Sequence, residues 1–188
     1  MVTIKMKFIQ ITIILIMTLF LVSCGGTNME KKIAKFETNQ GYFKIELFTE
    51  EMPITTANFI KLAEDGFYDG TRFHRIISGF MIQGGDPLSK EDSQKNKWGT
   101  GGPGYKIKDE FGDLGNKKGT IAMANSGPNT GGSQFFINLV DNNYLDSKHP
   151  VFGKIVEGMH IIEKLGNVQT GYGDVPTEDV IVEKIVIS

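Results

Sequence analysis

The sequence predicts a mainly β fold, a closed eight-stranded antiparallel β-barrel capped by two α-helices. Short apolar segments, several with partial apolar/polar alternation, recur between turn residues, and only two segments have the apolar pattern of a helix. The 188 residues include 23 Gly but only 6 Pro, which is typical of many turns and short strands. With 40% hydrophobic residues, a chain of this length can bury one sizeable core.

The first strands form the clearest hairpin. Residues 34–37 and 42–48 alternate in part, and Asn39-Gln40-Gly41 between them is typical of a tight turn. Further strand candidates follow at residues 71–76, 80–83, 120–124, 134–139, 150–156 and 180–187.

Two segments are expected to be helices. Residues 53–65 begin with Pro53, which suits a first helical turn, and they end before Gly66, which suits a C-terminal cap. Residues 159–165 are the second candidate. The charged residues 88–98 have no periodicity, which favours a loop.

The N-terminus resembles a bacterial lipoprotein signal. A short basic region precedes an apolar stretch from Phe8 to Val22, which is shorter than the about 20 residues needed to span hydrocarbon. The sequence Leu21-Val22-Ser23-Cys24 follows, and Cys24 is the only Cys of the chain. An uncleaved signal anchor with a passive Cys24 is the alternative.

This resemblance divides the chain into three parts. We expect residues 1–23 to be a removed signal peptide, residues 24–32 to be a tether, and residues 33–188 to form one domain. Cys24 would carry acyl chains such as palmitate, which would anchor the protein to lipid on the extracytoplasmic face of a bacterial membrane.

Composition and motifs exclude several functions. The chain has 20 Lys and Arg and 22 Asp and Glu, for a net charge of -2, which argues against a nucleic-acid partner. Metal-ligand spacings are absent, so we expect no metal and no cofactor. Ser133 and His149 lack the surroundings of a nucleophilic hydrolase, and residues 99–104 lack the Lys-Ser/Thr end of a phosphate loop.

Three long motifs are distinctive: FHRIISGFMIQGGD at residues 73–86, MANSGPNTGGSQFFI at 123–137 and LDSKHPVFG at 145–153. Together they closely resemble the cyclophilin family of peptidyl-prolyl cis-trans isomerases, over residues 32–187. The resemblance implies an eight-stranded antiparallel barrel with two capping helices, as the strand pattern also predicts.

The resemblance also implies roles for individual residues. It assigns catalytic roles to Arg75, Gln83, Asn125 and His149. It assigns substrate binding to Phe80, Met81, Phe136 and Leu145 around the proline ring, and to Ala124, Gln134, Gly101 and Gly102 along the peptide. Tyr144 belongs to the same surface but stands where many members have Trp, so we expect weakened binding of the cyclic peptide inhibitor cyclosporin. Residues 88–98 are also longer than the connection usual in bacterial members.

These residue types suit rotation about a peptide bond. Amide resonance opposes that rotation by about 18–20 kcal/mol, and the twisted state localises a lone pair on the proline nitrogen. A guanidinium aimed at this nitrogen binds the twisted state better than the planar one. Arg75 keeps its charge at any relevant pH, and an apolar pocket can hold the ring.

The expected function is therefore isomerisation of X-Pro bonds in proline-containing polypeptides, assisting exported proteins to fold at a membrane surface, by a monomer. A non-catalytic proline-peptide binding or chaperone module is the alternative, although the presence of Arg75 points away from it. A small-ligand barrel of the lipocalin type would need a hollow interior, which the bulky strand residues disfavour. Taken singly, Arg75 would be a solvated charge and Phe136 a core residue, and only the joint pattern favours the site.

Overall fold

The computed structural model describes residues 31–188. The predicted signal peptide, Cys24 and most of the expected tether lie outside the described residues. Among the helices of residues 31–188, none combines the length and the apolar character that crossing a membrane requires.

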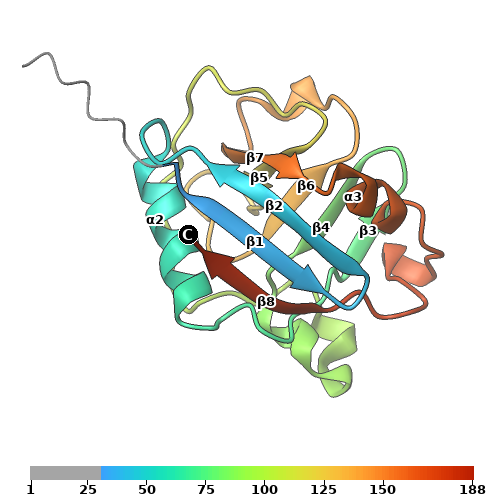
Figure 1. The fold of residues 1–188 in the computed structure, drawn as a ribbon. Helices are drawn as coiled ribbons and strands as arrows, with labels where there is room; N and C mark the ends of the chain where they lie inside the picture. Colours follow the sequence, from blue (N-terminus) through green and yellow to red (C-terminus); the bar gives the residue numbers. More distant parts are fainter. Residues whose placement is uncertain (1–30) are drawn as a thin grey trace, which may run out of the picture. The chain divides into compact units, whose positions relative to one another are not determined.

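Eight antiparallel strands form one sheet in the order β3-β4-β6-β5-β7-β2-β1-β8 (Figure 1). They are β1 (Ile33–Thr38), β2 (Gly41–Leu47), β3 (Arg75–Ile77), β4 (Met81–Gly84), β5 (Thr120–Met123), β6 (Phe135–Asn138), β7 (Val151–Glu157) and β8 (Val182–Ile187). The helices are α2 (Pro53–Glu64) and α3 (Met159–Leu165). The prediction of a mainly β fold with eight strands and two helices is confirmed.

The first hairpin follows directly from alternation. In β1, every second residue is buried, and Phe36 pairs with Phe43 of β2 on the inner face. The two rings stack with centroids 4.6 Å apart. Gly41 opens β2 with a φ of 123°, a conformation that favours glycine.

The prediction of a closed barrel is wrong. Strands β3 and β8 are the edges of the sheet, which is an open half-barrel. The chain just before β3 meets β8 and the residues before it over a short stretch. Arg72 forms an isolated bridge with Ile181, and the amides of Phe73 and Val182 donate to the carbonyls of Val180 and Thr71. Closure needs edge strands that pair along their length, whereas β3 has only 3 residues. The expected strand at residues 71–76 is shorter and begins later than its apolar pattern suggested.

Aromatic side chains fill the interior. Phe36, Phe59, Phe73 and Phe135 are fully buried in one cluster, to which both helices contribute apolar residues. In Figure 1, α2 and α3 lie at opposite ends of the strands drawn in front, β1, β2 and β8. The filled interior leaves no lipocalin-type cavity at the centre of the described domain.

Residues 87–97 are more ordered than the sequence pattern suggested. They form two short 3-10 helices, η1 (Pro87–Lys90) and η2 (Asp92–Lys97). The side chain of Asp86 caps η1 by accepting a hydrogen bond from the Leu88 amide, 2.7 Å away. This segment projects below the sheet in Figure 1.

Candidate active site

Strand pairing places three of the expected site residues in one row. Arg75 of β3 lies opposite Gln83 of β4, and Gln83 lies opposite Phe136 of β6. Directly paired residues share a face of a sheet, so these side chains lie side by side. Ile82 and Ile137 alternate with them and belong to the core cluster. The row therefore lies on the outer face of the sheet.

An apolar cluster adjoins this row. Met81 and Phe136 are 2% and 5% exposed, and their cluster is separate from the main core. Phe80 and Leu145 pack against that cluster and are only partly buried. The expected proline-ring residues are thus brought together near the surface, and we call this group the apolar pocket.

Side-chain amides link this row to residues 99–102, which we call the glycine turn. Gln83 Nε2 donates to Gln134 Oε1 at 2.9 Å, and Gln134 Nε2 donates to the Gly101 carbonyl at 2.8 Å. Both Gln side chains are oriented by these bonds. Each Gln also keeps hydrogen-bonding capacity for a bound peptide.

Asp86 holds the glycine turn in place, a role that sequence reasoning missed. Its fully buried carboxylate accepts hydrogen bonds from the amides of Gly99 and Gly101. A Cβ at Gly101 would lie only 2.1 Å from Asp86 Oδ1, so glycine is required there, whereas a Cβ at Gly102 would meet nothing. Asp86 ends the first sequence motif, which was the only available signal.

The glycine turn forms one wall of a pocket of about 420 Å3. Gln83, Ala124, Asn125 and Gln134 line it together with Gly101 and Gly102. The Asn125 side chain donates to the Lys148 carbonyl at 2.7 Å, which ties this wall to the segment before His149. The expected peptide-lining residues therefore face one hollow beside Arg75 and its row.

His149 stands at the edge of the apolar pocket. Its Nδ1 lies 3.1 Å from the Met123 carbonyl, a bond that requires a proton on Nδ1 and leaves Nε2 available. The ring meets Phe136 edge to face, with centroids 5.3 Å apart. This contact places the imidazole against the pocket where the proline ring is expected.

Tyr144 lies on the short 3-10 helix η3 (Asn143–Leu145) and contacts the same apolar group through Phe80. Its ring stacks on Phe80 with centroids 6.3 Å apart, and the residue is 65% exposed. The hydroxyl makes no hydrogen bond within residues 31–188. Tyr144 therefore presents both a ring face and a polar group to anything bound in the groove.

Asp174 is a second neighbour that sequence reasoning missed. Its Oδ2 lies 3.4 Å from Arg75 Nε, although the residues are 99 positions apart. Asp174 has a φ of 61° and follows Gly173, which also has a positive φ. This turn aims the carboxylate at the back of the guanidinium, so the terminal nitrogens of Arg75 remain available. No local sequence signal links these two positions.

His74, the neighbour of Arg75 in the chain, is a buried titratable residue. Burial lowers the pKa of its imidazole, while the Asp86 carboxylate opposes this effect more weakly. The Arg72 carbonyl also favours the charged ring slightly, but it lies outside hydrogen-bond geometry, and neither ring nitrogen has a partner in the described chain. Burial therefore favours the neutral form of the ring.

No group of three or more His, Cys, Asp or Glu side chains within residues 31–188 is placed to hold a metal ion. The site instead combines one guanidinium, several amides and an apolar pocket on the outer face of an antiparallel half-barrel. This combination is chemically suited to a peptide that carries an apolar ring.

Comparison with known proteins identifies the family. The model of the family described as cyclophilin type peptidyl-prolyl cis-trans isomerase/CLD matches residues 33–187. A peptidyl-prolyl cis-trans isomerase of Arabidopsis thaliana is 43% identical over 152 residues, covering 80% of this chain and 92% of the relative. One of Helicobacter pylori is 46% identical over 136 residues, covering 70% and 78%.

A solved structure agrees with these relatives. The crystal structure of a cyclophilin type peptidyl-prolyl cis-trans isomerase of Cryptosporidium parvum matches with a TM-score of 0.77 and 34% identity, covering 84% of this chain and 98% of that one. The chain belongs to the cyclophilin family. Its enzyme class is that of the cyclophilin-type peptidyl-prolyl cis-trans isomerases.

Proposed function

We propose that Arg75 is the catalytic donor and that the Phe80, Met81, Phe136 and Leu145 pocket holds the proline ring of a protein substrate. The observation that carries this proposal is the row on the outer sheet face, where strand pairing sets Arg75 beside Gln83 and Phe136.

The chemistry follows from rotation of the X-Pro bond. As the bond twists, the proline nitrogen loses amide resonance and becomes a hydrogen-bond acceptor. The terminal N–H groups of Arg75 donate to that nitrogen only in the twisted state, which is the condition for lowering the barrier. Gln83, Asn125 and Gln134 hold the peptide backbone, and His149 closes the edge of the ring pocket.

A relative supports the ligand class. The same Cryptosporidium parvum enzyme has a crystal structure in the presence of the dipeptide Ala-Pro, which matches this chain with a TM-score of 0.75 and 34% identity. An Ala-Pro unit contains the ring and the preceding carbonyl that the proposed site would hold. Proline-containing polypeptides are therefore the proposed substrates.

The test compares Arg75→Ala and Arg75→Lys with wild type in an isomerisation assay on a short X-Pro peptide, using the full-length chain in detergent. Loss of one transition-state donor lowers turnover by about 100- to 1,000-fold, so Arg75→Ala should fall in this range. Arg75→Lys keeps the charge but loses the planar fork, and only part of the activity should return. Arg75 is half-exposed, so the melting temperature should stay near that of wild type. Wild-type turnover in Arg75→Ala would refute the assignment.

We also propose that the enzyme acts on exported proteins while anchored through Cys24 to the extracytoplasmic face of a bacterial membrane. Residues 1–23 would be the signal peptide, 24–32 the tether and 33–188 the isomerase domain. The support is the basic and apolar run before Leu21-Val22-Ser23-Cys24. Each buried methylene of an acyl chain contributes about 0.8 kcal/mol, so two or more chains would anchor the protein stably.

Intact-mass measurement of wild type and Cys24→Ser tests the anchor. Wild type should begin at Cys24 and carry the added mass of acyl chains, whereas Cys24→Ser should remain an unprocessed precursor. A mature wild-type protein with an unmodified thiol, or one cleaved elsewhere, would refute lipidation while leaving the isomerase assignment intact.

A further inference from the structure

A larger pocket adjoins the peptide-lining pocket. Its volume is about 970 Å3, and we call it the side pocket. Arg75 and Gln83 of the sheet line it, together with Lys95 and Trp98 from the segment around η2 and with Tyr172 and Pro176 from the segment before β8. Gln83 and Gly99 line both pockets, so a polypeptide bound beside Arg75 runs directly past the opening of the side pocket.

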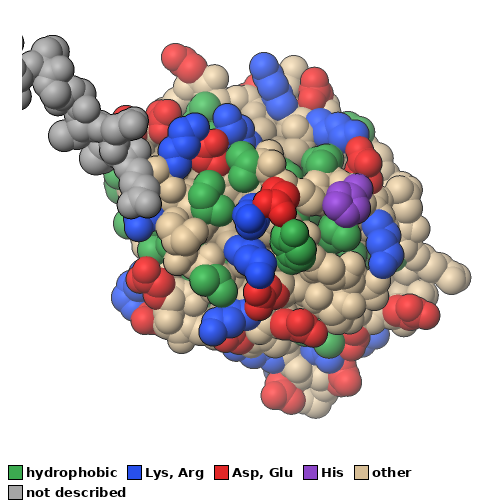
Figure 2. All heavy atoms as spheres, viewed as in Figure 1, with side chains coloured by type: hydrophobic (Ala, Val, Ile, Leu, Met, Phe, Trp, Pro, Cys, Tyr) green, Lys and Arg blue, Asp and Glu red, His purple; other side chains and the backbone are tan. Residues whose placement is uncertain are grey.

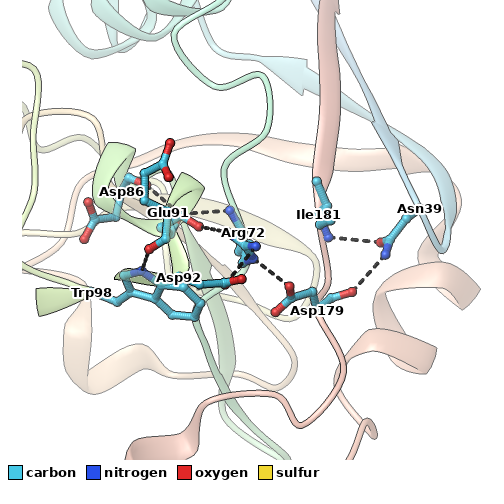
Figure 3. Close-up of polar contacts among 9 residues, drawn as sticks. Asn39, Arg72, Asp86, Glu91, Asp92, Trp98, Asp179 and Ile181 are labelled. Atoms are coloured by element: carbon cyan, nitrogen blue, oxygen red, sulfur yellow. Dashed lines mark hydrogen bonds and ion pairs between the residues drawn. The ribbon is translucent and has the colours of Figure 1, made fainter. Parts of the chain in front are cut away.

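The wall that carries Lys95 is held by a buried arginine. Arg72 forms ion pairs with Asp92 at 3.1 Å and Asp179 at 2.9 Å, and its side chain is only 11% exposed. It also donates to the Ser89 carbonyl. Figure 3 shows Arg72 between the two carboxylates, which come from η2 and from the segment before β8.

Trp98 completes this support. The Arg72 guanidinium lies 5.2 Å from the centre of the indole ring, and the indole N–H donates to the Glu91 carbonyl at 3.2 Å (Figure 3). Lys95 Nζ lies 5.3 Å from the same ring. The side pocket is therefore preorganised by the segment that exceeds the usual family length, and binding there would cost little ordering of the wall.

The lining has a positive bias. Lys95 and Arg75 contribute cations, and no Asp or Glu is among the described residues that line the pocket. The Asp174 carboxylate partly neutralises Arg75 from behind, at 3.4 Å. Lys95, in contrast, has no carboxylate partner within residues 31–188. The positive charge of the lining is a local exception in a chain with a net charge of -2.

Polar groups in the pocket also lack partners. His74 lines it and is 3% exposed, yet neither of its ring nitrogens is hydrogen-bonded within the described chain. The position that a Cβ of Gly99 would occupy lies 3.6 Å from His74 Nε2, so this edge of the ring lies beneath the glycine turn. Buried nitrogens of this kind are costly unless a ligand or a neighbour satisfies them.

We propose that the side pocket is a further substrate subsite, which receives an acidic side chain flanking the X-Pro unit and pairs it with Lys95. This inference rests on the proposed function, because the polypeptide must first lie beside Arg75. It assigns the enzyme a preference among substrates, namely proline-containing segments with a carboxylate near the proline.

The experiment uses peptide pairs and the full-length chain in detergent. A short X-Pro peptide carries a single Glu at each position from three residues before to three residues after the proline, and each peptide has a matched Gln version. NMR exchange measures kcat and KM at low and high salt. The variants are Lys95→Gln, Lys95→Glu and, as a matched control, Lys97→Gln, because Lys97 belongs to the same helix η2 but does not line the pocket.

At one flanking position, wild type should prefer the Glu peptide over its Gln partner by about two- to fivefold, the range of an exposed ion pair. The difference should lie in KM and should vanish at high salt. Lys95→Gln should abolish it and Lys95→Glu should reverse it, whereas Lys97→Gln should retain it and leave turnover of the Gln peptides unchanged.

Two results overturn the inference. One is an equal rate on Glu and Gln peptides at every position, and the other is an equal loss of preference in Lys95→Gln and Lys97→Gln. Both leave normal turnover of the Gln peptides, so they spare the proposed function. Absence of turnover on every peptide would instead overturn the proposed function and the inference together.

Discussion

The outer face over β1, β2 and β8 and the outer face over β3, β4 and β6 belong to one sheet, but they carry different side chains. The first face is charged, with Lys35 paired to Glu37 and Lys44 paired to Glu157, each at 2.7 Å. Figure 2 shows this face, where blue and red side chains are interspersed. On the second face, Arg75 stands beside the apolar cluster of Met81 and Phe136.

The difference shows where apolar/polar alternation along a strand stops indicating which residues are buried. In β1 and β2, buried and less buried residues alternate, because water covers one face and the core covers the other. In β6, all four residues are buried, because loop residues such as Phe80 and Leu145 pack over the outer face as well. The covering is incomplete, because Phe80 and Leu145 are only partly buried, and this is where we propose that the proline ring binds. A functional groove here is an outer sheet face only partly covered by apolar loop residues.

The largest expected effect contrasts one aromatic residue from each face. Phe136→Ala should lower the free energy of unfolding by about 3–5 kcal/mol, because Phe136 is 5% exposed, and it should also raise KM for X-Pro peptides. Tyr42→Ala removes an aromatic ring that is 49% exposed on the charged face, so its effect should be much smaller, with activity unchanged. Urea unfolding and the isomerisation assay provide the measurements. Equal losses of stability would contradict the contrast.

The second effect concerns the exposed aromatic residue of the groove. Tyr144→Trp should strengthen cyclosporin inhibition about ten- to hundredfold, because an indole offers a larger face and a differently placed N–H donor. Turnover of short peptides should change much less, because an indole can keep the stacking on Phe80 and the other ring-pocket residues do not stack on residue 144. Paired inhibitor titrations and turnover measurements check this. If turnover changes as much as inhibition does, Tyr144 is not a selectivity residue.

The third effect is a fall in the stability of the folded state in acid, which we expect from His74 next to Arg75. Because the folded-state pKa of His74 is lowered below its ordinary value of about 6.5, the unfolded chain binds more protons below that pH. The stability of the folded state should therefore fall as the pH drops below about 6.5, by up to about 1.4 kcal/mol per pH unit from this residue. Above that pH the contribution is constant.

Urea unfolding of wild type and His74→Gln between pH 7.5 and 5 would measure this contribution. The variant should have a flatter profile than wild type, whatever its absolute stability. Parallel profiles for the two proteins would show that the imidazole is not responsible.

The smallest effect belongs to the charged face. Hydrogen bonding to Glu157 raises the pKa of Lys44, and the same contact lowers the pKa of the Glu157 carboxyl. Both side chains are exposed enough for solvent to screen the pair, so Lys44→Met should change neither thermal stability nor turnover measurably. A clear loss of activity in Lys44→Met would show that the two faces are coupled through the sheet.

Patterns among neighbouring residues in the sequence were sufficient to predict most strands and helices. Alternation located β1 and β2, while Pro53 and Gly66 bounded the segment that forms α2. Strand register places two residues of one long motif, Arg75 and Gln83, side by side. Their roles in a groove stay predictions. These features depend on neighbours in sequence or on one hairpin, and a single sequence carries that information.

Only the tertiary structure decided the features that join distant segments. The half-barrel stays open because β3 is short and does not pair with β8. Only the residues before β3 meet β8 and its preceding segment, around the bridge between Arg72 and Ile181. The side pocket exists because Arg72 gathers Asp92 and Asp179 from separate segments. A lone arginine and two carboxylates have no periodicity, and their pairing depends on distances that form only when the chain has folded. The sequence therefore determined the strands and the residues of the candidate site, whereas folding decided the edge of the sheet and the second pocket beside Arg75.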